Sequence, residues 1–238
     1  MKKLALLTAA LLGSSLALAQ APAPKAAGIE SQGYQWNAQA GEKIEALHKK
    51  GDIVNGKDAY EVCGACHLPS GAGRPDGTFP QLAGQHSTVL IKQIADIRAG
   101  LRDNPTMYPF AKSLNDPQEL ADVAVYIQSL CIPLDHGQYE GPDAAIQVAT
   151  GKELYEKECK TCHGINGQGD KEKFYPVIAG QHYAYLLRQM TQIRDGKRRN
   201  ANPDMVKIIK AYSDKQLVAI SAFQASLSMP GAMCKAKK

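Results

Sequence analysis

CGACH at residues 63–67 and CKTCH at residues 159–163 carry one pattern, Cys-x-x-Cys-His. Two cysteines three positions apart lie on one helical turn, where each thiol can form a thioether with one vinyl group of a single porphyrin. The histidine after the second cysteine then faces the iron as an axial ligand. A zinc site would not need that histidine at both places. The pattern therefore predicts two covalently bound haem c groups, attached at Cys63, Cys66, Cys159 and Cys162, with His67 and His163 as iron ligands.

The rest of the chain repeats in the register of the two motifs. Residues 63–100 align with residues 159–196 at an offset of 96, including the stretch AGQH at 83–86 with AGQH at 179–182. Two extra residues in the second copy then move the offset to 98. There Met107 aligns with Met205, each in an Asn-Pro-x-Met pattern. A repeat of this length predicts two domains of one fold.

The spacing of apolar residues predicts an all-α chain, because we find helical periodicity and no alternating stretch long enough for a sheet. Each half should contain a short helix that opens near Gly56 or Gly151 and ends in the haem motif. A middle helix and a final helix follow, with the methionine just before the final one. The apolar stripes of these helices are Leu90, Ile94 and Ile97, then Leu120, Val123 and Tyr126, with Leu186, Met190, Ile193, Leu217, Ile220 and Phe223 as their counterparts.

The amino terminus has the features of a secretory signal. Lys2 and Lys3 precede an apolar run from Leu4 to Leu18, which ends in a small-x-small cleavage site at Ala19. The run is too short for a comfortable membrane span. The remaining chain of about 219 residues fits two small domains better than one. We therefore expect a signal peptide at 1–19, a mobile leader that can include one extra helix at 20–50, a first domain at 51–131, a linker at 132–148 and a second domain at 149–238.

The sixth iron ligand decides whether a haem transfers electrons or binds small molecules. Met107 and Met205 occupy the only methionine position that the two halves share, so we expect them to be the sixth ligands. His86 and His182 also repeat and are the rival ligands; otherwise they cap a helix or contact a haem propionate. No acidic residue recurs near the methionines. The sequence therefore favours an electron carrier with no catalytic residue over a haem enzyme such as a peroxidase.

The charge balance is weakly informative. The formal net charge is +5, and four haem propionates would offset most of it, so nothing indicates a nucleic-acid partner. The basic run at residues 197–199 is predicted to be a solvated loop. The alternative is a docking patch for an acidic redox partner.

Two tandem domains with Phe/Tyr-Pro-x-x-Ala-Gly-Gln-His after each haem motif, and a methionine before the last helix, resemble the diheme cytochrome c4 family over residues 56–227. The resemblance implies two class I cytochrome c domains, each wrapped around one His/Met-ligated haem. It implies that the carbonyl groups of Pro80 and Pro176 accept hydrogen bonds from the proximal histidines. It also implies a periplasmic carrier that shuttles single electrons through transient contacts, from a dehydrogenase or quinol-oxidising complex to an acceptor such as a membrane-bound terminal oxidase.

Three features depart from the family pattern: the leader, the long linker, and two cysteines outside the haem motifs. They also fit a relative that is the electron-accepting subunit of a periplasmic dehydrogenase, for example one that oxidises thiosulfate. Cys131 and Cys234 each follow a final helix. In an oxidising compartment such a pair favours a disulfide. Two free thiols, or a thiolate ligand to iron, are the alternatives.

Overall fold

The computed structural model describes residues 23–235 apart from residues 39, 115 and 230, so the predicted signal peptide lies outside the described residues. This part of the chain contains two isolated β-bridges but no strand, which confirms the all-α prediction. No helix in the described residues has the length and apolar character needed to cross a membrane. The helices are α1 (Glu42–His48), α2 (Ile53–His67), α3 (Ser87–Arg98), α4 (Tyr108–Ser113), α5 (Pro117–Ser129), α6 (Ala144–Glu158), α7 (Lys160–His163), α8 (Tyr183–Arg194), α9 (Pro203–Ile209) and α10 (Asp214–Ser226).

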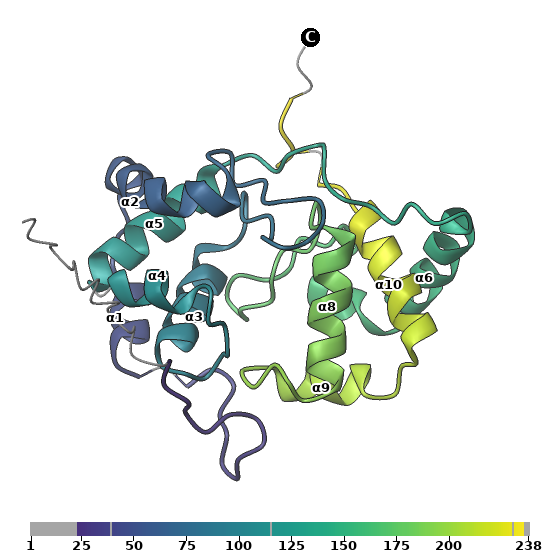
Figure 1. The fold of residues 1–238 in the computed structure, drawn as a ribbon, viewed down its shortest axis with the longest axis horizontal. Coiled ribbons are helices and arrows are strands. Elements are labelled where there is room, and N and C mark those ends of the chain that lie inside the picture. The colour runs from purple at the N-terminus through teal and green to yellow at the C-terminus, as the bar shows by residue number, and fades with distance from the viewer. Residues whose placement is uncertain (1–22, 39, 115, 230, 236–238) are drawn as a thin grey trace, which may run out of the picture.

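The two halves use equivalent helices in the same order. Helices α2, α3, α4 and α5 of the first half correspond to α6 with α7, α8, α9 and α10 of the second. In each half the first helix packs against the final one, α2 on α5 and α6 on α10, and the middle helix packs against the final helix as well. Figure 1 shows the first half on the left and the second half on the right. The chain is therefore a tandem pair of domains, as predicted.

The first helix of each half begins earlier than the sequence predicts. Helix α2 starts at Ile53 rather than near Gly56, because the side chain of Asp52 accepts hydrogen bonds from the backbone N–H groups of residues 54 and 55. Helix α6 starts at Ala144, within the segment predicted to be a linker. Its first turns face solvent, with Ile146 68% exposed. Exposed turns carry no apolar periodicity, so the pattern could not show this helix start.

A glycine lies where the first and final helices of each half cross. A Cβ atom on Gly56 would overlap the carbonyl oxygen of Asp122 in α5, and one on Gly151 would overlap the carbonyl oxygen of Ala219 in α10. The overlap is with backbone, so the helices would have to separate. We expect Gly56→Ala to lower the free energy of unfolding by about 1–3 kcal/mol or more, measured by chemical denaturation. Gly64→Ala is the matched control in the same helix, because its nearest neighbours would be 3.7 Å away; equal stability of the two variants would contradict this account.

The repeated AGQH stretches join the two halves. The amide of Gln85 makes two bonds to the backbone of Val177: its Nε2 donates to the carbonyl oxygen and its Oε1 accepts from the N–H, both at 2.9 Å. Gln181 makes the equivalent bonds to Gln81, at 2.9 and 3.0 Å. These matched contacts relate the halves by a pseudo-twofold axis at their interface.

Ile132, the first linker residue, is fully buried between the halves. Gly84 and Gly180 have φ of +71° and +72°, and a Cβ atom on either would overlap the Ile132 side chain. Glycine is therefore needed at both places for its backbone conformation and for the close approach of Ile132. The linker begins as part of the packed interface.

Cys131 and Cys234 form a disulfide bond, with Cα atoms 4.9 Å apart. The bond lies beside a short parallel β-bridge. In it the Ile132 N–H donates to the carbonyl oxygen of Ala232, and the Cys234 N–H donates to the carbonyl oxygen of Ile132, both at 2.8 Å. The linker is thus tied to the C-terminal tail.

The segment predicted to be a mobile leader contacts the body of the protein at several places between Ala26 and Lys43. Its one helix, α1, lies against α3 and α5 of the first half. The side chain of Lys43 in α1 is buried and pairs with Asp96 of α3 at 3.5 Å. The prediction of an extra helix is confirmed, whereas the prediction of mobility is not supported by these contacts.

Candidate functional site

Each Cys-x-x-Cys-His stretch ends the first helical segment of its half, at His67 and at His163. The residue after each histidine has positive φ, +64° at Leu68 and +77° at Gly164, so the chain turns away sharply. A buried tyrosine holds this turn in each half. The hydroxyl of Tyr60 donates to the carbonyl oxygen of Leu68 at 2.9 Å, and that of Tyr155 donates to the carbonyl oxygen of Gly164 at 2.6 Å.

Both histidine rings are oriented by a proline carbonyl. Nδ1 of His67 lies 2.9 Å from the carbonyl oxygen of Pro80, and Nδ1 of His163 lies 3.4 Å from that of Pro176. A carbonyl only accepts, so each Nδ1 carries the hydrogen and each Nε2 keeps its lone pair. Burial lowers the pKa of both imidazoles, which keeps them neutral. A neutral ring with Nε2 available is the form that binds iron.

The four predicted axial ligands meet in one cavity of about 650 Å³ between the halves. His67 and Met107 line it from the first half, and His163 and Met205 line it from the second. The methionines do not directly precede the final helices as predicted. Met107 is the N-cap of α4 and Met205 lies in the first turn of α9. These short helices form because each has proline at its start, where the missing N–H costs nothing.

The rival histidines lie outside this cavity. Nε2 of His86 is 2.8 Å from the carbonyl oxygen of Gln168, and Nε2 of His182 is 2.8 Å from that of Ala72. Each bond crosses to the opposite half. Both histidines occupy the N-cap positions of their helices, α3 and α8, as the helix-cap prediction has it, but neither side chain bonds to the helix it precedes. They are interdomain contacts that follow directly after Gln85 and Gln181 in the repeated stretch.

His182 gives the interface a dependence on pH. The ring is fully buried, its Nδ1 accepts from the Gly137 N–H at 3.0 Å, and burial lowers its pKa. The unfolded chain takes up a proton near the ordinary pKa of about 6.5, before the folded chain does. Stability is thus complete above that pH and falls below it, by up to about 1.4 kcal/mol per pH unit. Denaturation at pH 8 and pH 5 should show this loss, and His182→Gln should reduce it; an equal loss in both chains would contradict the assignment.

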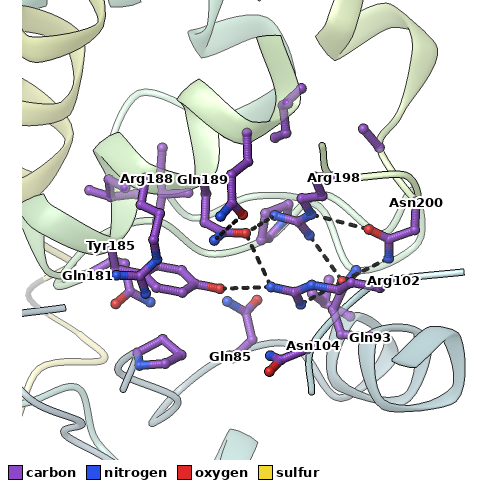
Figure 2. A pocket seen from close by; sticks show the side chains of 18 of the residues that line it. Gln85, Gln93, Arg102, Asn104, Gln181, Tyr185, Arg188, Gln189, Arg198 and Asn200 are labelled. Atoms are coloured by element: carbon purple, nitrogen blue, oxygen red, sulfur yellow. Dashed lines mark hydrogen bonds between the residues drawn. The ribbon is translucent and has the colours of Figure 1, made fainter. Parts of the chain in front are cut away.

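A cluster of arginine and glutamine side chains joins the halves inside the cavity (Figure 2). Oε1 of Gln93 accepts from Arg102 at 2.9 Å and from Arg198 at 3.0 Å. Oε1 of Gln189 accepts from the same two arginines, at 3.2 and 3.0 Å. The Tyr185 hydroxyl accepts a further bond from Arg102 at 3.2 Å. One arginine from each half is thus held at the interface by neutral amides.

The cluster favours an anion. Burial and the neighbouring Arg102 lower the pKa of Arg198 to about 10. Burial alone would raise the pKa of Tyr185, but the charges of Arg102 and Arg198 outweigh it and lower the pKa. Two neighbouring guanidinium groups, held in place by neutral amides, would suit the carboxylates of a porphyrin in this cavity.

The basic run at residues 197–199 is only in part the solvated loop that the sequence predicts, because Lys197 alone of its three side chains is exposed. Arg198 lines the cavity and Arg199 is buried, 7% exposed. The prediction failed for the two arginines because three adjacent cations resemble a surface loop. A signal was present in the repeat: Arg198 aligns with Arg102 at the offset of 96.

Comparison with known proteins agrees with this geometry. The cytochrome c family model matches residues 53–131 and residues 148–228, one match in each half. The chain is 33% identical to cytochrome c4 of Azotobacter vinelandii over 188 residues, which cover 74% of this chain and 89% of that protein. It belongs to the diheme cytochrome c4 family. The crystal structure of reduced recombinant cytochrome c4 from Pseudomonas stutzeri is similar in fold, with a TM-score of 0.64 and 32% identity, covering 75% of this chain and 100% of that one.

A second kind of relative is also similar. The thiosulfate dehydrogenase electron acceptor of Stutzerimonas stutzeri strain A1501 is 33% identical over 175 residues, covering 71% of this chain and 80% of that protein. Membership of the cytochrome c4 family confirms two covalently bound haem c groups and the role of electron carrier rather than enzyme. The neutral histidines and the paired arginines of the cavity fit such groups.

Proposed function

We propose that both irons of this cytochrome c4 are His/Met ligated, the first by His67 and Met107 and the second by His163 and Met205. The observation that carries the proposal is the shared cavity, which these four side chains line in two matched pairs. Each haem, when bound, supplies one reversible electron at its iron. Thioethers at Cys63, Cys66, Cys159 and Cys162 hold the two groups in place.

The remaining residues of the cavity orient and stabilise these groups. Pro80 and Pro176 keep a hydrogen on Nδ1 of each proximal histidine and so direct Nε2 toward the iron. Arg102 and Arg198 would hold propionate carboxylates at the interface, where residues of both halves line the cavity. The two sites are therefore neighbours in one shared cavity, which suits a carrier of two electrons taken up singly.

The carrier acts in the periplasm between a dehydrogenase and a terminal acceptor. The secretory signal predicted at residues 1–19 supports export. Similarity to a protein named as a thiosulfate dehydrogenase electron acceptor supports a dehydrogenase as the donor. Mixing the oxidised protein with thiosulfate and purified thiosulfate dehydrogenase tests this partner. Reduction of both haems during turnover is expected, and no reduction above the rate without enzyme would exclude that donor.

Potentiometry tests the ligand set. We expect two one-electron waves, both well above the range of bis-histidine haems, because methionine ligation favours Fe(II). The potentials of the two waves should differ because the surroundings of the two histidines differ. Phe79 lies beside His67, and the guanidinium carbon of Arg74 is 5.8 Å from the centroid of its ring. Tyr175 lies beside His163 and stacks on a tryptophan instead. A strongly negative wave would contradict the proposed pairing of histidine with methionine.

A further inference from the structure

The first match to the cytochrome c family model begins at residue 53. The segment that precedes it contacts both halves. It starts on the first half, where the Ala26 N–H donates to the carbonyl oxygen of Gly100 at 3.0 Å. It then reaches the second half. There the Ile29 N–H donates to the carbonyl oxygen of Arg199 at 2.8 Å, and the Glu30 carboxylate pairs with the Arg199 guanidinium at 2.9 Å. The Ile29 side chain also packs on an apolar cluster of the second half.

The chain then returns across the interface. The ring of Trp36 stacks on Tyr175 of the second half, with centroids 6.2 Å apart, and the ammonium of Lys92 from the first half lies 5.3 Å from the Trp36 ring. Helix α1 completes the return, with Lys43 paired to Asp96 in α3. Figure 1 shows this segment as the purple loop along the lower edge of the molecule.

Two close approaches show that the body of the protein is shaped to this segment. A Cβ atom on Gly28 would lie 2.6 Å from Cβ of Arg199, and one on Gly100 would overlap the carbonyl group of Pro24. Gly196 is the counterpart of Gly100 in the second half and has nothing within 4 Å. The segment therefore packs on Gly100 but not on its counterpart Gly196, and it breaks the pseudo-twofold symmetry of the two halves.

We propose that residues 24–38 and 40–43 form an interdomain strap that fixes the two halves relative to one another, and that Trp36 is a positioning residue for the second haem site. Trp36 lines the shared cavity and covers Tyr175, whose ring lies 6.4 Å from that of His163. The equivalent Phe79 in the first half is faced by Arg74 instead. Trp36 thus excludes water from the second site only. This inference rests on the proposed function in one respect: the proposed ligands identify the iron that Trp36 affects.

Reduction potentials test the role of Trp36. Exposure to water favours Fe(III), so Trp36→Ala should shift the second wave to lower potential and leave the first in place. Trp36→Phe keeps an aromatic ring at this position, so its second wave should lie close to that of the unaltered protein. Gln35→Ala is the control next in sequence, because Gln35 belongs to the strap but is exposed and does not line the cavity, and it should move neither wave. The second wave is identified as the one displaced in Met205→Ala. No shift in Trp36→Ala, or an equal shift of both waves, would overturn the assignment.

Hydrogen exchange tests the strap. Deletion of residues 23–38 from the exported chain should speed exchange of the Gln81 and Val177 N–H groups, which bond across the interface, by about tenfold or more. If the shortened chain does not fold, Ile29→Ala combined with Glu30→Gln asks the same question in a full-length chain. Unchanged exchange would overturn the strap. A wrong ligand set would instead be visible in the unaltered protein, in its spectrum and potentials, so the two failures are distinguishable.

Discussion

Met107→Ala should open the first iron, and only the first, to an external ligand such as imidazole or cyanide, and Met205→Ala should do the same for the second. Each methionine lines the shared cavity, as does the histidine of the same half. Removing one leaves that iron with a single strong axial ligand, while the other half keeps both. Rapid ligand binding should therefore involve half of the haem absorbance in either variant and all of it in the double variant.

Met229→Leu is the control for methionine loss, because Met229 packs in the second half without lining the cavity. It should leave both irons unreactive toward the added ligand. A Met107→Ala protein whose haems both stay low-spin and unreactive would show that another side chain holds that position. His86 would then be the first candidate, and its bond to Gln168 would have to break to supply it.

Replacing Cys131 and Cys234 together by serine should lower the free energy of unfolding by about 2–5 kcal/mol, toward the upper value in the chain-entropy model because the closed loop spans about 100 residues. The sequence separation is 103, and the bond ties the linker to the C-terminal tail beside the buried Ile132. Its loss should loosen the interface without removing a haem. Denaturation followed by haem absorbance and by far-ultraviolet circular dichroism measures the change.

Alkylation gives an independent measure of the same bond. Intact mass after treatment under denaturing, non-reducing conditions should show no alkylated thiol, since four cysteines carry haem and two are bridged. Two alkylated thiols per chain would show that the bridge is absent from the exported protein. In the denaturation experiment, equal free energies of unfolding for the double-serine and unaltered chains would contradict the stabilising role of the disulfide.

Local patterns were enough to predict the two haem groups. The Cys-x-x-Cys-His stretches are short motifs whose spacing reflects the geometry of one porphyrin, whereas the methionine ligands rest on the repeat and stay a proposal. The fold class followed from periodicity in α3, α5, α8 and α10, whose periodic leucines are buried, namely Leu90, Leu120, Leu186 and Leu217. The disulfide could be predicted because Cys131 and Cys234 were the only cysteines left over.

Contacts between the halves could not be predicted in the same way. Gln85 and His86 were visible as a repeat, but their bonds to Val177 and Gln168 depend on how one domain faces the other. Arg198 looked like a surface charge for the same reason. Trp36 and the rest of the strap have no counterpart in the repeat, so no comparison of the halves could assign them a place.

The far-red spectrum of the fully oxidised protein tests the central claim most directly. Methionine-ligated ferric haem has a weak absorption band in the far red, and magnetic circular dichroism measures its intensity per haem. The account predicts an intensity equal to two methionine-ligated low-spin haems per chain, lowered to one in Met107→Ala and in Met205→Ala. A band equal to one or none in the unaltered protein, or a high-spin signal from either haem, would contradict it.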